Sequence, residues 1–193
     1  MGYNLRVATL ADCEVVRHLI GRSIRALGTG DYTAEQIEAA LLGAFGLDTQ
    51  LISDRTYFVV VTDAGEVVGC GGWSRRRTLF GSDSRAERDD AWLDPATEGA
   101  KIRAFFIDPG HVRRGLGRRI LERCESEARY AGFQTLEMMA TLPGVRLYEA
   151  CGYIADPPIT YPLTGGLQIQ FVPMHKQMGQ SALTPKRGIS NQP

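Results

Sequence analysis

The sequence predicts an α/β (α+β) protein with one mixed sheet that carries helices on both faces. Three observations predict this class: an alternating first strand at residues 3–9, a pair of apolar strands at 56–73, and strand–helix–strand segments from residue 100 onward. A short connection joins antiparallel strands, whereas a strand–helix–strand crossover joins parallel ones, so both arrangements are expected in one sheet. We expect a single domain over residues 1–176 and a polar tail, expected to be mobile, at 177–193.

Two helices are expected between the first strand and the strand pair. Thr9 is followed by Asp12, and Thr33 by Gln36, which is the spacing of a capping box at a helix start. The second helix is expected to run to about Leu42. Apolar residues follow the first cap at helical spacing, namely Val16, Leu19, Ile20, Ile24 and Leu27.

The second half of the chain begins with a polar, turn-rich segment at residues 74–99 that separates two central strands. A loop of this length inside a domain is uncommon and is often functional. Pro109 is expected to end the strand that follows, and Gly132 to end the next helix. The remaining sequence predicts a strand, a short helix and a closing strand, at residues 134–142, 143–151 and 166–176.

Composition excludes several function classes. Lys+Arg and Asp+Glu both number 22, so no overall charge attracts nucleic acid or an anionic membrane. The apolar runs are far shorter than the roughly 20 residues that cross a bilayer, and the first residues lack a secretory apolar region. We therefore expect a cytoplasmic protein that binds no membrane.

The cysteines and histidines do not form a metal-binding pattern. The four cysteines are scattered and the three histidines do not have helical ligand spacing, so we expect neither a metal site nor a disulfide framework. Each cysteine lies among apolar or small residues. This setting predicts four reduced thiols in the core.

The segment HVRRGLGRRIL, residues 111–121, predicts an anion site at a helix start. Its glycines, Gly115 and Gly117, allow close approach to the backbone, and a helix N-terminus presents unpaired N–H groups. Arg113 and Arg114 have no carboxylate at helical spacing, which favours phosphate contact. The later arginines have such neighbours, because Arg118 and Arg119 lie three or four residues from Glu122, and Arg123 lies four from Glu127.

Two common nucleotide motifs do not fit this segment. The run lacks the Lys and Ser/Thr of a phosphate-binding P-loop, and it lacks the third glycine of a dinucleotide fingerprint. It also follows a late strand, whereas a dinucleotide fingerprint follows the first strand of its fold.

The segment FFIDPGHVRRGLGRRIL resembles the acyl-CoA-binding segment of the GNAT superfamily, the GCN5-related N-acetyltransferases. TLPGVRLYEACGY is similar to the second family signature, a short helix with a tyrosine shortly before Gly-Tyr, and FVPMHK is similar to the closing strand. The resemblance covers about residues 3–176. It implies the GNAT fold, with a mixed, largely antiparallel central sheet flanked by helices on both faces, and acetyl-CoA as co-substrate without a metal.

The resemblance implies that pantetheine runs beside the strand RAFFI, where N–H groups near Phe106 and Ile107 bind it. Val112 stands where the family usually has Gln or Arg, and Thr141 where it often has Asn. The implied coenzyme contacts are Phe105, Phe106, Ile107, Val112, Arg113, Arg114, Gly115, Leu116, Gly117, Arg118 and Thr141.

Tyr148 matches the tyrosine that protonates the leaving thiolate in the family. A phenol with a pKa of about 10 is protonated at neutral pH, although the position also suits a core aromatic. The sequence does not single out one general base for the amine. The candidates are Glu98, Asp94, Asp90 and Asp89, of which we select Glu98. If the amine loses its proton to water, no dedicated base is needed.

The expected partner is an amine, either a small molecule or a protein or peptide amino group. The resemblance implies direct attack of this amine on acetyl-CoA. A non-catalytic acyl-CoA sensor is the alternative. Nucleic-acid binding through the arginines at 75–77 and the four arginines of residues 111–121 is disfavoured by the balanced charge and by the lack of interleaved aromatics. Dimers are common among similar proteins, so a homodimer is one expected assembly.

Overall fold

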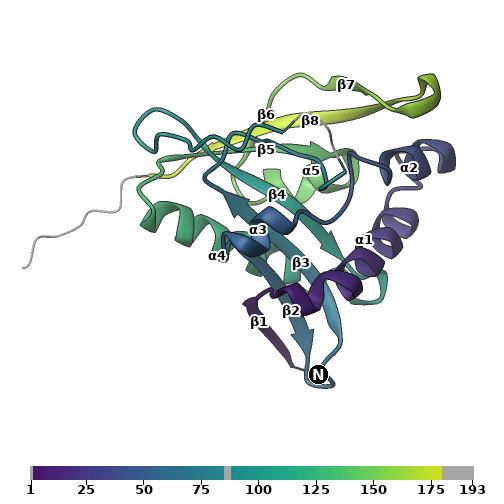
Figure 1. The fold of residues 1–193 in the computed structure, drawn as a ribbon, viewed down its shortest axis with the longest axis horizontal. Coiled ribbons are helices and arrows are strands. Elements are labelled where there is room, and N and C mark those ends of the chain that lie inside the picture. The colour runs from purple at the N-terminus through teal and green to yellow at the C-terminus, as the bar shows by residue number, and fades with distance from the viewer. Residues whose placement is uncertain (1, 85–87, 180–193) are drawn as a thin grey trace, which may run out of the picture.

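An eight-stranded sheet organises the part of the chain that the computed structural model describes, residues 2–84 and 88–179 (Figure 1). Its order is β1-β2-β3-β4-β5-β8-β6, with β7 also paired to β8. Only β4 and β5 are parallel, which confirms a mixed, largely antiparallel sheet. The strands are β1 (Tyr3–Val7), β2 (Tyr57–Thr62), β3 (Val67–Ser74), β4 (Ala100–Ile107), β5 (Thr135–Thr141), β6 (Ile154–Ala155), β7 (Ile159–Pro162) and β8 (Gln168–Gln177).

Helices cover both faces of the sheet, and Figure 1 shows α3 in front of it and α4 behind it. On one face α1 and α3 pack apolar side chains such as Leu19 and Leu51 against Val59 and Cys70. On the other face α4 packs Ile120 and its apolar neighbours against the strands. The helices are α1 (Cys13–Leu27), α2 (Ala34–Ala40), α3 (Thr49–Ser53), α4 (Leu116–Tyr130) and α5 (Val145–Glu149).

Both capping boxes are present. Thr33 Oγ1 accepts from the Gln36 N–H at 3.2 Å, and Gln36 Oε1 accepts from the Thr33 N–H at 2.8 Å. Asp12 Oδ2 likewise accepts from the Thr9 N–H at 2.8 Å, but the turn that follows Thr9 is a 3-10 turn, and α1 begins after it. Each box satisfies N–H groups that a helix start otherwise leaves unpaired.

Three elements were not expected: α3, β6 and β7. Each is short, and β6 and β7 are held by pairing with β8, so their stability depends on a tertiary neighbour. Of the tail expected at 177–193, residues 180–193 lie outside the described residues.

The cysteine prediction is confirmed in part. All four are free thiols, and Cys70 and Cys124 are buried, but Cys13 and Cys151 are only half-buried. In residues 2–84 and 88–179, no group of three or more His, Cys, Asp or Glu side chains could hold a metal ion, and no helix is long and apolar enough to cross a membrane.

Candidate active site

The sheet opens where β4 and β5 separate. These two strands pair only over Ala100–Ile102 and Leu136–Met138. Beyond that point β4 remains paired with β3 as far as Ile107, and β5 remains paired with β8 as far as Thr141. A gap therefore opens between the C-terminal halves of β4 and β5, in the middle of the sheet.

A β-bulge in β4 lies at the start of this gap. Between the pairs Cys70–Phe106 and Gly72–Arg103, β4 has two residues where β3 has one. One of the two, Ala104, has φ 54°, a left-handed conformation that non-glycine residues rarely adopt. The bulge places the Phe105 side chain on the α4 face, and the next residue, Phe106, on the opposite face.

The register of β4 decides which backbone groups face the gap. The Asp108 N–H donates to the Val68 carbonyl at 2.9 Å, so Phe106 opposite Cys70 is the next hydrogen-bonded pair of the antiparallel ladder. The N–H of Phe106 therefore points toward β3. Ile107, between these pairs, directs its N–H toward the gap. Of the two N–H groups expected to face the coenzyme, the register directs only that of Ile107 that way.

The anion site predicted at residues 111–121 has the geometry of a free helix start. Gly115 has φ 76° and no side chain, and α4 begins directly after it. The Arg119 N–H donates to the Gly115 carbonyl at 3.0 Å, so the three preceding N–H groups come before the helical hydrogen bonds. The cap residue supplies no side-chain acceptor for them. These donors and the helix dipole favour an anion here.

The arginines of this segment divide into two groups. Arg113 and Arg114 are exposed, and neither has an ion-pair partner among the described residues. Arg118 and Arg119 contact backbone carbonyls rather than Glu122: Arg118 donates to Ala150 at 3.1 Å, and Arg119 to Tyr3 at 2.7 Å. The expected Glu122 pairs are therefore absent from the described part of the chain. The Arg123–Glu127 pair, at 2.7 Å, is confirmed.

The second glycine joins the loop to α5. A Cβ atom at Gly117 would lie 2.9 Å from Leu147 Cδ2 and 4.0 Å from Ile107 Cγ1. The absence of a side chain therefore lets the first turn of α4 pack closely on α5 and on the end of β4. This contact brings the predicted anion site, the free edge of β4 and the helix of Tyr148 together. Val112 is half-buried and Leu116 is buried beside them.

Tyr148 lies on α5 at the gap, where it is 8% exposed. Its ring packs edge-on against Phe105, with centroids 6.2 Å apart, and against Tyr153 at 6.0 Å. Burial raises the pKa of its hydroxyl above the ordinary value of about 10, so the phenol is protonated at neutral pH. Thr141, at the end of β5, lines the same gap.

A cavity of about 60 Å³ fills the gap and reaches both faces of the sheet. Tyr148 and Phe105 line it on the α4 face, and Phe45, Phe80 and Phe171 on the α2 face. A larger open hollow, about 490 Å³, lies against the C-terminal half of α4 and contains none of the predicted site residues. Of the predicted coenzyme contacts, Phe105, Phe106 and Thr141 line the smaller cavity.

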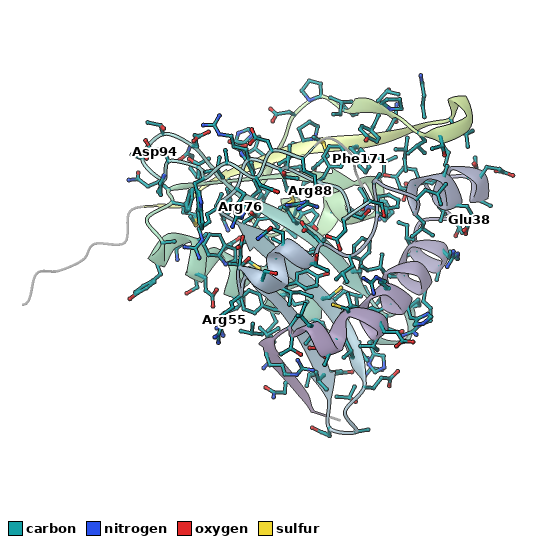
Figure 2. The ribbon with its side chains drawn as sticks, in the orientation of Figure 1. Glu38, Arg55, Arg76, Arg88, Asp94 and Phe171 are labelled. Atoms are coloured by element: carbon teal, nitrogen blue, oxygen red, sulfur yellow. The ribbon has the colours of Figure 1, made fainter. Side chains whose placement is uncertain are left out.

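Glu98 is not brought to this gap. It precedes β4, and Phe105 lies roughly 20 Å further along the extended chain. Its carboxylate pairs with Arg77 at 3.2 Å and accepts from the Asp94 N–H at 2.8 Å, contacts that fix the long loop. In Figure 2 the neighbouring Asp94 lies at the left of the molecule, far from Phe171.

Sequence reasoning missed two groups that shape the gap. Tyr57 holds the bulge by donating from Oη to the Ala104 carbonyl at 3.0 Å. Asp48, which is fully buried, pairs with Arg103 of β4 at 2.6 Å and with Arg88 of the long loop at 2.9 Å. The sequence places Tyr57 in a predicted strand but gives no sign of its contact with Ala104. Asp48 lies in a segment for which the sequence predicts no helix or strand.

Comparison with known proteins identifies the family. The sequence profile described as the Acetyltransferase (GNAT) family matches residues 25–153, about two thirds of the chain. The chain belongs to the GNAT acetyltransferase family. The match includes the gap, the glycine loop and Tyr148. The protein is thus an acetyltransferase by family, as the resemblance predicted, whereas a search of curated protein sequences finds no match.

Solved GNAT structures share this fold at low sequence identity. A GCN5-related N-acetyltransferase from Rhodopseudomonas palustris is 19% identical over 92% of this chain and 97% of its own, with a TM-score of 0.67. The protein yncA from Salmonella typhimurium, solved with acetyl-CoA, is 18% identical over 94% and 97%, with a TM-score of 0.63. The ribosomal-protein-S18-alanine N-acetyltransferase from Escherichia coli is 16% identical over 95% and 98%, with a TM-score of 0.58.

Proposed function

We propose that this GNAT protein transfers the acetyl group of acetyl-CoA to a primary amine by direct attack within a ternary complex. The observation that carries the proposal is the cavity in the gap, which is lined by the protonated Tyr148 and by β4, while the free helix start packs beside α5 and the end of β4 through Gly117. Because the cavity reaches both faces of the sheet, the two substrates can enter from opposite sides.

The coenzyme is expected on the α4 face. The N–H groups at the start of α4 and the exposed Arg113 and Arg114 would hold its pyrophosphate, with the neighbouring residues of the loop around it. Pantetheine would then follow the unpaired edge of β4, where the Ile107 N–H faces it, and pass Thr141 and Phe105. The similar protein yncA was solved with acetyl-CoA, which supports this choice of acyl donor.

The chemistry follows from the thioester. The neutral amine nitrogen attacks the carbonyl carbon, a C–N bond forms and the C–S bond breaks. The amine nitrogen loses one proton and the sulfur gains one. Tyr148 donates a hydrogen bond to the departing sulfur, and any proton that its phenol gives up is replaced from the attacking amine. The Ile107 N–H, which faces the gap, favours the charge that develops on the carbonyl oxygen.

No dedicated carboxylate base is needed for this reaction. Among the described residues that line the cavity there is no Asp or Glu, and Glu98 contributes to the long loop instead. We therefore assign to water the loss of the ammonium proton that must precede attack, and we place Glu98 outside the reacting centre. The arginines at 75–77 also do not form a free basic patch, because Arg76 pairs with Asp54 and Arg77 with Glu98.

The test against an acyl-CoA sensor is a turnover assay. The protein is incubated with acetyl-CoA and a set of primary amines, and free thiol and acetylated amine are quantified together. The transferase function is supported if free thiol and acetylated amine form in equal amounts and neither forms when the amine is left out. Tight coenzyme binding with no thiol release on any amine, peptide amines included, overturns it in favour of the sensor.

A further inference from the structure

The α2 face of the gap is an aromatic wall. Phe45, Phe80 and Phe171 line the cavity together with Phe106. Phe80, from the long loop, lies 5.0 Å from Tyr161 of β7 and 5.3 Å from Phe171 of β8, measured between ring centroids. Phe45 contacts Phe106 and Phe171 edge-on, at 6.5 and 5.9 Å. Four separate segments thus bring aromatic rings to one side of the reaction site.

The described residues of this wall include no Asp or Glu. Among the described residues that line the cavity, the one ionised side chain is that of Arg103. Its partner Asp48 lies behind it and is shared with Arg88, so two guanidinium groups meet one fully buried carboxylate. A second cationic group of an acceptor that lies beside this wall would meet the Arg103 guanidinium and no carboxylate of the described lining residues, which is unfavourable.

The cavity is too small to hold the whole acceptor molecule. At roughly 10–15 Å³ for each water molecule, about 60 Å³ holds about four to six waters, so the cavity accommodates the amine group and a few adjoining atoms. The remainder of the acceptor must lie at the rim. Phe80 and Tyr161 are half-buried there and present ring surface from the loop and from β7.

We propose that the acceptor is a primary amine joined to an apolar or aromatic group and carrying no second cation, bound against Phe80 and its neighbours. This proposal rests on the proposed transferase function. Aromatic rings gain from burial of apolar surface and from edge-on contacts, which favours such acceptors over polyamines or lysine-rich peptides.

The test compares matched amines under one set of conditions. 2-Phenylethylamine and a peptide with an N-terminal phenylalanine represent apolar acceptors; butane-1,4-diamine and a lysine-rich peptide represent cationic ones. We expect kcat/KM to be at least about tenfold higher for an apolar acceptor, the order of discrimination that an apolar pocket provides. Comparison of the two apolar probes shows whether a small amine or a peptide amino group is the preferred acceptor.

Phe80→Ala is expected to lower kcat/KM for 2-phenylethylamine about tenfold, while the binding of coenzyme A stays unchanged. Phe80→Leu, which keeps apolar bulk, should recover most of the loss. Tyr130→Ala is the control, because Tyr130 is 97% exposed on α4 and far from the cavity. Faster acetylation of the cationic acceptors, or no effect of Phe80→Ala, overturns the proposal but leaves the transferase standing. Absence of thiol release with every amine overturns both.

Discussion

Tyr57 Oη donates a hydrogen bond to the carbonyl oxygen of Ala104 at 3.0 Å, across the strand that separates them in the sheet. Ala104 has φ 54° and forms the bulge at which β4 leaves β5. The Tyr57 side chain is fully buried in the α1 face, whereas Ala104 is half-buried and lines the cavity. The left-handed residue is costly by itself, and the hydrogen bond helps to hold it in place. The gap therefore depends on a side chain outside the cavity.

Tyr57→Phe should destabilise the protein and slow acetyl transfer. Loss of the hydroxyl leaves the half-buried Ala104 carbonyl without its strong donor, so we expect the free energy of unfolding to fall by about 1 kcal/mol. Because the bulge orients the free edge of β4, kcat should fall as well. Urea unfolding and steady-state kinetics measure both, with the exposed Tyr130→Phe as control. An unchanged kcat would contradict the prediction that the bulge contributes to catalysis.

Arg113→Ala and Arg114→Ala should weaken the binding of coenzyme A by roughly tenfold each, because each removes one charge-assisted contact to phosphate. Binding of pantetheine, which has no phosphate, should not change. Calorimetric titration measures both ligands. Arg129→Ala, an exposed arginine at the far end of α4, is the matched control. An equal loss for pantetheine would contradict phosphate contact by these arginines.

Stability should fall in acid through the Asp12–Arg6 pair. Hydrogen bonds from the Arg6 guanidinium lower the pKa of Asp12 from 3.8 to about 2. The carboxylate thus stabilises the fold above about pH 4, and this contribution is lost as the pH falls from 4 to 2. Asp12→Asn should lower the free energy of unfolding by about 1–2 kcal/mol at pH 7 and by little at pH 2. Urea titrations at both pH values measure this, with Glu14→Gln as control; an equal loss at both would contradict the pKa shift.

The activity should not decline on the alkaline side below about pH 10. Burial raises the pKa of Tyr148, so the phenol keeps its proton where an ordinary tyrosine begins to lose it. Deprotonation of the acceptor amine meanwhile raises the rate as the pH increases. A pH profile of kcat/KM should therefore rise and level off. A descending limb with an apparent pKa of 8 to 9 would contradict the role of the buried tyrosine.

The sequence allowed the fold to be predicted wherever local signals were strong. The capping boxes at Thr9 and Thr33, the strand pair from residue 56 and the apolar face of α4 are local patterns, and all appear in the structure. Strands β6 and β7 were missed because they depend on pairing with β8. Strand β6 has only two residues, which is too short to show the alternation of apolar and polar residues that predicts a strand.

The site was predictable where a motif lies in one segment. The glycine loop and the helix of Tyr148 were found in this way, and Gly117 against Leu147 explains why they meet. The bulge was not predictable, because Ala104 gives no sign of a left-handed conformation. The place of Glu98 in a charged loop suggests a base, and only the pairing of β4 shows how far Glu98 lies from Phe105. The aromatic wall likewise joins four segments that are distant in the sequence.

The most direct test of the account is the rate of thiol release from acetyl-CoA in Tyr148→Phe. The substitution keeps the ring that packs on Phe105 and removes only the hydroxyl at the gap. We predict that kcat falls about 100-fold, within the range of general-acid contributions, while the KM for acetyl-CoA changes less than about twofold. An unchanged kcat in a correctly folded variant would contradict a catalytic role for Tyr148.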